Sequence, residues 1–107
     1  MIRGSVWWVE FDPAVGTEIH KTRPAVIVSN DTANKFLARV VVVPLTSNIS
    51  RIYPGEAVVT VNGNKSKAMT DQIMSADKSR LKNKIAELSD NDIVSLENAM
   101  KRFFNLL

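Results

Sequence analysis

Arg23 and Thr46 are polar residues that stand directly beside two apolar runs of the chain. Arg23 precedes the run Pro24–Ser29, and Thr46 follows the run Arg39–Leu45. If these runs form neighbouring antiparallel strands, both residues lie at one edge of the sheet, within reach of Glu18 in the preceding loop. From spacing alone, the simpler interpretation is a pair of strand ends with local hydrogen bonds. The alternative is a site in which the two side chains act together.

Several common catalytic sites are excluded by residue type. One histidine and no cysteine leave none of the usual ligand sets for zinc. The four glycines match neither a P-loop nor a Rossmann dinucleotide pattern. His20 alone cannot supply a ribonuclease that uses two histidines, and no nucleophile-elbow sequence supports a serine triad around it. We therefore expect neither a metal nor a cofactor.

Basic residues gather in the second half of the chain. The formal net charge is +3, and the pI is about 9.5. The segment from Ser47 to Lys84 holds seven lysines and arginines against three aspartates and glutamates. This excess indicates either a solvated, lysine-rich surface or a basic rim that attracts phosphate, and composition does not decide between them.

Length and composition predict one domain covering residues 1–107. The 107 residues are 45% hydrophobic, which is enough for a single core. The absence of cysteine fits a reducing compartment. The N-terminus carries no secretory apolar segment, and no run approaches the roughly 18 residues of a membrane span. We therefore expect a cytoplasmic protein that does not enter a membrane.

The first half of the chain predicts strands separated by polar loops. Apolar, β-branched runs predict three strands, at Ser5–Phe11, Pro24–Ser29 and Arg39–Leu45. Between the first two lies the polar loop Ala14–Thr22. Asn30 and Asp31 are expected to cap a short helical turn that ends at Phe36. Pro44 has no N–H to donate to a ladder, so it should lie near a strand end or at a bulge.

The second half predicts shorter strands and a terminal helix. The expected strands are Glu56–Val61, Ala68–Met74 and Lys82–Glu87. A second polar loop, Ser47–Gly55, precedes them, and Asn62-Gly63 predicts a tight turn. Ser89 is a good helix cap followed by acidic residues. The apolar residues beyond it recur at helical spacing, at Ile93, Leu96, Met100, Phe103 and Leu107.

Strands first and a helix last indicate an α+β fold that is mainly β. A strongly bent antiparallel sheet or small barrel, with the helix laid against it, buries the most surface with the least chain. The aromatic residues are expected in the core or at an interface rather than as a platform for stacked bases; they are Trp7, Trp8, Phe11, Phe103 and Phe104.

Three linked motifs occur in order along the chain, namely Gly16-Thr17-Glu18, Arg23-Pro24 and Pro44-Leu45-Thr46-Ser47. They are accompanied by GSVWWV at Gly4–Val9, FDP at Phe11–Pro13, PAVIVSN at Pro24–Asn30, Tyr53-Pro54, and DQI at Asp71–Ile73. In order and separation these motifs resemble the MazF/PemK (Kid) family of toxin endoribonucleases from toxin–antitoxin pairs. The resemblance runs nearly from end to end of the chain.

The resemblance implies a fold, an activity and partners. The family folds as an SH3-like small barrel of antiparallel strands with a C-terminal helix. Its members form homodimers, cut single-stranded RNA at short sequences without a metal, and are bound by a cognate antitoxin protein. The implied antitoxin inserts a hydrophobic and acidic tail into a groove beside the dimer interface.

The resemblance also implies roles for residues of this chain. Arg23 matches the family's catalytic arginine and Thr46 its catalytic threonine. Glu18 matches a loop glutamate proposed as a base or positioning group, and Asp71 matches an aspartate implicated at the site. The further residues expected to bind RNA or support the site are Gln72, Ser47, Asn48, Arg51 and Lys21. His20 lies at an unmatched position and receives no role.

Metal-free RNA cleavage can use the 2′-OH of the substrate as the nucleophile. The protein then needs a base near the 2′-OH and charge stabilisation at the phosphorus, and the planar guanidinium of Arg23 suits the second need. Thr46 adds a hydrogen bond to a phosphoryl oxygen, and Glu18 is the candidate base. No residue is assigned as the acid that protonates the leaving oxygen.

Two other interpretations belong to different classes of protein. The same fold occurs in toxins that poison DNA gyrase by binding it and have no catalytic site, but those toxins lack the linked motifs at Arg23 and Thr46. A third interpretation is an SH3-like interaction module without activity, which the intact Glu18, Arg23 and Thr46 disfavour.

Overall fold

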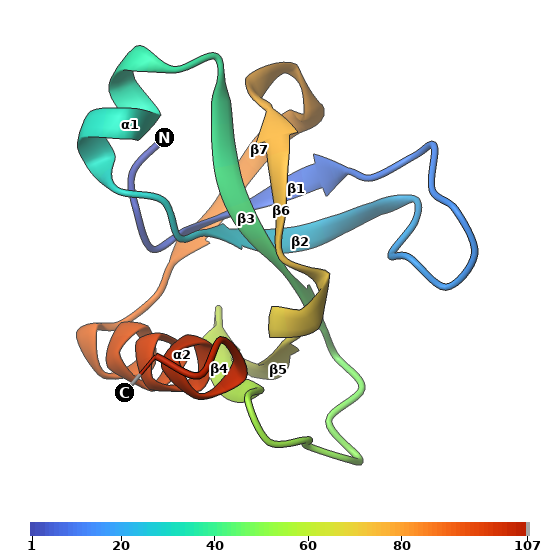
Figure 1. Cartoon of the computed structure of the whole chain (residues 1–107), viewed down its shortest axis with the longest axis vertical. Helices are drawn as coiled ribbons and strands as arrows, with labels where there is room; N and C mark the ends of the chain where they lie inside the picture. Colours follow the sequence, from blue (N-terminus) through green and yellow to red (C-terminus); the bar gives the residue numbers. More distant parts are fainter. Residues whose placement is uncertain (107) are drawn as a thin grey trace.

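A curled antiparallel sheet with one long helix packed against it forms the computed structural model, which describes residues 1–106 (Figure 1). Its strands are β1 (Ser5–Glu10), β2 (Thr22–Ile27), β3 (Arg39–Thr46), β4 (Ala57–Val61), β5 (Asn64–Ala68), β6 (Met74–Asp77) and β7 (Leu81–Glu87). Its helices are α1 (Asp31–Phe36) and α2 (Asp90–Phe103), with two short 3-10 turns, η1 (Thr70–Gln72) and η2 (Lys78–Arg80).

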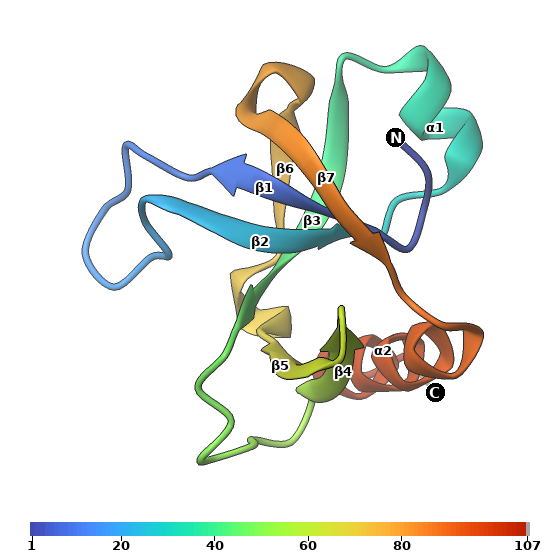
Figure 2. The same cartoon turned by 180° about the vertical axis from the view of Figure 1, so that it is seen from behind.

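The strands lie in the order β4-β5-β3-β2-β1-β7, and β6 also pairs with β3. All of these pairs are antiparallel. The sheet curls because β3 pairs with β2 and β6 along most of its length and with β5 only at its last two residues. Figures 1 and 2 show the resulting half-barrel with α2 beside β4. The predicted mainly-β barrel of antiparallel strands with a C-terminal helix is confirmed.

Two clusters of buried side chains fill the two sides of the sheet. Val43 belongs to the cluster that α2 covers through Leu96, whereas its neighbour Val42 belongs to the second cluster with Phe11. Successive side chains of a strand point to opposite faces, so a continuous apolar run is required where both faces are buried. This explains the apolar runs Ala25–Ile27 in β2 and Val40–Leu45 in β3.

Pro44 lies where β3 exchanges one partner strand for another. Ala25 of β2 stands opposite Pro44, and the next residue, Leu45, pairs with Ala68 of β5. The carbonyl of Pro44 accepts a hydrogen bond from the backbone N–H of Met69 at 2.9 Å. The prediction that Pro44 lies near a strand end is confirmed, and the change of partner there turns the chain toward the second loop.

The hairpin between β4 and β5 closes with a two-residue turn. Asn62 and Gly63 have φ of 49° and 82°, and Val61 pairs with Asn64 across the turn. Two successive residues with positive φ are what a type I′ turn requires, and Asn-Gly is the preferred pair for it. The predicted turn is confirmed.

The strand predicted at Ala68–Met74 is wrong. β5 ends at Ala68, the chain makes the turn η1, and β6 begins at Met74. The hydroxyl of Thr70 donates to the carbonyl of Gly55, and this contact holds η1 against the second loop. The strand Asn64–Ala68 was missed because its side chains are mostly polar, since the hairpin with β4 buries only Ala68.

The cap at Ser89 is confirmed, since its hydroxyl accepts the backbone N–H of Asp92 at 3.2 Å. The apolar stripe of α2 is only partly buried, because Phe103 is 44% exposed. Its last predicted member, Leu107, falls outside the described residues. Of the five aromatic residues that the sequence placed in the core or at an interface, Phe11 is buried and Trp7 packs on the second cluster. The others stay exposed on the single chain, at Trp8, Phe103 and Phe104.

None of the helices within residues 1–106 is both long and apolar enough to span a membrane.

Candidate active site

Arg23 and Thr46 lie at the same end of neighbouring antiparallel strands. Arg23 is the second residue of β2, and Thr46 is the last residue of β3. The ladder between β2 and β3 ends at the pair Ala25–Pro44, and Arg23 and Thr46 each lie two residues beyond this pair. The two residues therefore lie at the same end of neighbouring strands, as the sequence predicted, and their joint action stays a prediction.

The guanidinium of Arg23 makes one local contact. Its Nε donates to the carbonyl of His20 at 3.3 Å, and the residue is half-buried. Within residues 1–106 this is the only hydrogen bond of the Arg23 side chain, so the terminal nitrogens Nη1 and Nη2 remain available. The contact with His20 sets the direction of the arginine while leaving its two-pronged end for an anion.

The hydroxyl of Thr46 also makes one local contact. Its Oγ1 accepts a hydrogen bond from the backbone N–H of Asn48 at 3.2 Å. A hydroxyl carries one donor and can accept through its oxygen at the same time. Since the oxygen is already oriented by Asn48, the O–H of Thr46 is left to donate.

Glu18 lies in the loop between β1 and β2, where its carboxylate is exposed. Its Oε1 accepts the backbone N–H of Val15 at 2.7 Å, and its own N–H donates to the carbonyl of Val15 at 3.2 Å. These two contacts close a small turn around Gly16, which has φ of +60°. Positive φ favours glycine, so the motif Gly16-Thr17-Glu18 suits this turn.

A cleft of about 430 Å³ separates the loop of Glu18 from the turn η1. Glu18 lines one wall, and Asp71 and Gln72 line the other. The side-chain carbonyl of Gln72 accepts the backbone N–H of Ile19 at 3.2 Å. The structure thus brings three predicted residues to one cleft, and Gln72 acts there by holding the loop. Arg23 and Thr46 are not part of its lining.

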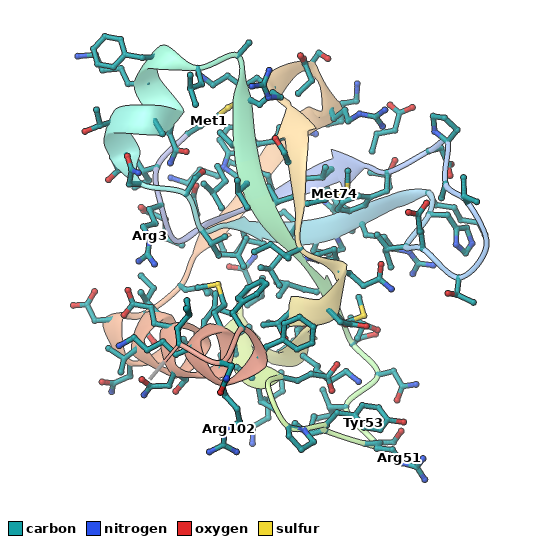
Figure 3. All side chains as sticks on the ribbon, in the orientation of Figure 1. Met1, Arg3, Arg51, Tyr53, Met74 and Arg102 are labelled. Atoms are coloured by element: carbon teal, nitrogen blue, oxygen red, sulfur yellow. The ribbon has the colours of Figure 1, made fainter. Side chains whose placement is uncertain are left out.

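The second loop, between β3 and β4, carries Ser47, Asn48 and Arg51, all of them exposed. Asn48 Oδ1 accepts two hydrogen bonds from Ser50, one from its backbone N–H at 3.2 Å and one from its side-chain hydroxyl at 2.8 Å. Figure 3 shows Arg51 and Tyr53 side by side at the far end of this loop. In Figures 1 and 2 both loops project on the same side of the half-barrel.

Lys21 and His20 occupy the last turn of the first loop. Lys21 has φ of 66°, its N–H donates to Asp12 Oδ1 at 3.0 Å, and its carbonyl accepts the N–H of Phe11 at 2.8 Å. Its backbone therefore closes the base of the loop, while its side chain is exposed. His20 contributes its carbonyl to Arg23, and its imidazole is given no role.

One group of residues at the second loop was not predicted. Lys67, Glu56 and Tyr53 form a polar cluster beneath the loop. Lys67 was counted only among the basic residues of its segment, because a lysine in the polar stretch Asn64–Ala68 is typical of a solvated strand. The signal that could have found the cluster is Glu56, an acidic residue placed immediately before a buried strand.

Comparison with known proteins places this geometry among characterised relatives. Residues 2–104 match the model of the family described as "PemK-like, MazF-like toxin of type II toxin-antitoxin system". The chain is 39% identical to Endoribonuclease MazF9 of Mycobacterium tuberculosis over 115 residues, which covers 99% of this chain and 98% of the relative.

Solved structures with the same fold include MazF of Deinococcus radiodurans, with a TM-score of 0.85, 23% identity, and coverage of 99% of this chain and 97% of the other. A mycobacterial endoribonuclease in complex with its cognate antitoxin matches with a TM-score of 0.84 and 22% identity. That match covers 100% of this chain and 97% of the other.

Proposed function

Since the chain belongs to the family of PemK-like, MazF-like toxins of type II toxin–antitoxin systems, we propose that it is an endoribonuclease that cuts single-stranded RNA. The observation that carries the proposal is the placement of Arg23 and Thr46 at one end of the β2–β3 pair. Each side chain is oriented by one local hydrogen bond and retains donors for a phosphate.

The reaction is an attack of the ribose 2′-OH on the adjacent phosphorus. A P–O2′ bond forms, the P–O5′ bond breaks, and the products are a 2′,3′-cyclic phosphate and a 5′-OH. Nη1 and Nη2 of Arg23 bind the phosphoryl oxygens, on which negative charge grows in the transition state. The O–H of Thr46 adds a hydrogen bond to one of these oxygens.

The two protons of the reaction go to different places. Glu18 receives the proton of the 2′-OH, and the 5′ oxygen takes up a proton as it leaves. Glu18 is supported as the base by its position in a cleft that also holds Asp71 and Gln72. No side chain is assigned as the acid at the 5′ oxygen.

The RNA is expected to lie between the two loops. Asp71 and Lys21 flank the first loop, and Ser47, Asn48 and Arg51 belong to the second. Single-stranded RNA is bound through phosphates and splayed bases, so exposed polar and basic side chains of this kind suit it. These residues are proposed to set the preferred cleavage sequence.

We further propose that this toxin acts in the cytoplasm as a homodimer and is inhibited by a cognate antitoxin. The structure of the mycobacterial endoribonuclease was solved in complex with its cognate antitoxin, and its chain has the same fold as this chain. An antitoxin that blocks the two loops would prevent RNA from reaching Arg23 and Thr46.

Cleavage of a long RNA by Arg23→Ala and Thr46→Ala tests the proposal. We expect each variant to lower the cleavage rate by about 10²–10³-fold or more, as the loss of a donor to the phosphoryl oxygens does. The matched controls are Arg39→Ala and Thr32→Ala, which change exposed residues away from the two loops. If either site variant retained the parental rate with an unchanged circular dichroism spectrum, the assignment of the site would be wrong.

A further inference from the structure

Lys67 is a lysine whose side chain is almost entirely covered. In the ladder between β3 and β5, Lys67 stands directly opposite Thr46. Its side chain is only 12% exposed, whereas Lys65, two residues earlier on the same strand, is exposed. Lysine is rarely covered to this extent unless its charge is paired. The burial therefore points to a specific set of contacts at its ammonium group.

The ammonium of Lys67 contacts two groups of the second loop and the carboxylate of Glu56, the residue that follows the loop. Nζ donates to the carbonyl of Arg51 at 3.0 Å and lies 3.3 Å from Oε1 of Glu56. It also lies over the ring of Tyr53, 5.4 Å from the ring centroid, where a cation is attracted by the aromatic face. An ammonium has three donors, and each of these contacts can take one.

Glu56 completes the contact from the other end of the loop. Its side chain is 9% exposed, and the same Oε1 that faces Lys67 accepts the backbone N–H of Tyr53 at 2.7 Å. The N–H of Glu56 in turn donates to the carbonyl of Tyr53 at 3.0 Å. Lys67 and Glu56 thus bind the loop at Arg51 and at Tyr53.

Removing either charge leaves the other one covered and unpaired. The unpaired group must recover water, and it does so by opening the structure that covers it. Here that structure is the loop itself, because Arg51 and Tyr53 supply the atoms that cover Lys67. The ion pair therefore couples the order of the loop to the strand position opposite Thr46.

We propose that Lys67, paired with Glu56, is a positioning residue that holds the loop Ser47–Gly55 in the conformation that binds RNA. Lys67 does not touch the substrate; it acts through Arg51 and Tyr53. The proposal rests on the endoribonuclease function inferred above, since the loop carries Ser47, Asn48 and Arg51.

Amide hydrogen exchange of the protein without RNA tests the contact directly. Lys67→Met keeps an unbranched side chain that is one heavy atom shorter, and it removes the charge. We expect the amides of residues 47–55, including that of Tyr53, to exchange at least about tenfold faster than in the wild type, because the covering loop opens. The amides of the first loop serve as an internal reference, and their exchange rates should not change in Lys67→Met. Lys65→Met is the matched control, and the amides of residues 47–55 should exchange in it at the wild-type rate.

Glu56→Gln approaches the same contact from the partner side, which keeps the test valid if Lys67→Met folds poorly. We expect Glu56→Gln to speed exchange of the same amides. The double variant Glu56→Gln/Lys67→Met should exchange more slowly than Lys67→Met, because it no longer holds an unpaired carboxylate. Effects that simply add in the double variant would contradict a direct pair.

Kinetics on a short RNA separate positioning from substrate contact. We expect Lys67→Met to raise KM by about tenfold while kcat changes far less, and the dependence of KM on salt to keep its slope. A lysine that bound phosphate itself would lower that slope by about one unit. A reduced slope, or unchanged exchange of residues 47–55, would overturn the assignment of Lys67. Intact RNA with the wild-type protein would instead overturn the proposed function, and exchange would still decide the contact.

Discussion

Glu18 is a catalytic candidate whose side chain, like those of Arg23 and Thr46, makes one local hydrogen bond. Its carboxylate accepts one backbone N–H, from Val15, and is otherwise exposed on the wall of the cleft. This contact fits two roles for Glu18, ordering of its own loop and acceptance of a proton from the substrate. Both roles require a carboxylate that is held in a fixed direction. Arg23 and Thr46 differ from it, since their free donors match one role each.

Glu18→Gln separates these roles at the level of one atom. Glutamine keeps an oxygen that can accept the N–H of Val15 but does not take a proton from the 2′-OH. We predict that the cleavage rate falls by about 10²-fold or more, while the exchange of the Val15 amide stays the same. A variant that cleaves at the parental rate would show that Glu18 only orders the loop. Single-turnover cleavage of a short RNA is the measurement.

The sequence predicted Arg23 and Thr46 as site residues but did not predict all of their neighbours. Their places beside apolar runs left two interpretations open, and the linked motifs around them favoured a site. The pair Ala25–Pro44 places both residues at the same end of β2 and β3. Lys67 was not identifiable, because its burial is produced by the loop that folds back over it. A side chain covered by residues that lie 11 to 16 positions away in the sequence leaves no local pattern.

At the level of elements, apolar runs were sufficient to predict most strands. β1, β2, β3, β4 and β7 were predicted within two residues at each end, and so was α1 with its cap at Asn30. The segment after Asn62-Gly63 failed, because β5 exposes most of its side chains and η1 interrupts the run that follows. The contact of Thr70 with Gly55 that fixes η1 joins residues from different elements, which a local pattern does not contain.

The turn η2 offers a test of a charged cap. Asp77 accepts the backbone N–H of Ser79 at 2.9 Å. The hydroxyl of Ser79, followed by its backbone N–H, holds the pKa of Asp77 below its ordinary value of 3.8, and the charges of Arg39 and Arg80 add to this. Because the pKa is lower in the folded chain, ionised Asp77 stabilises the fold at neutral pH, and this stabilisation is lost as the pH falls through the folded pKa.

We predict that Asp77→Ala is less stable than the wild type at neutral pH and that the difference shrinks in acid below pH 3.8. Asp77→Asn keeps the acceptor oxygen without the charge, so its loss at neutral pH should be smaller. Urea unfolding at both pH values measures the differences. A difference that is the same at both would mean that the charge of Asp77 does not stabilise the turn.

For the whole molecule, the exposed aromatic residues are the feature that a single chain does not explain. Trp8 is 41% exposed, and Phe103 and Phe104 are each 44% exposed, with their two rings in edge-to-face contact at 5.2 Å. Exposed aromatic side chains are enriched at protein–protein interfaces. The sequence predicted that these residues lie either in the core or at an interface. Because they are exposed on the single chain, only the interface remains of the two predicted places.

We predict that the protein sediments as a dimer of its 11.9 kDa chain, because a second copy would cover these rings. Sedimentation equilibrium over a range of concentrations gives the mass. A mass of 11.9 kDa at every concentration would contradict the proposed homodimer and would require another partner for the exposed aromatic residues.

Cleavage of RNA by 2′-OH attack at Arg23 and Thr46 leaves defined chemical groups on the two cut ends. Purified protein is incubated with a long RNA in EDTA, and the ends are mapped by primer extension and by their reactivity to kinase and phosphatase. We expect cuts at a short recurring sequence, with 5′-OH and 2′,3′-cyclic phosphate ends. Intact RNA, or ends carrying a 5′-phosphate and a 3′-OH, would contradict this expectation.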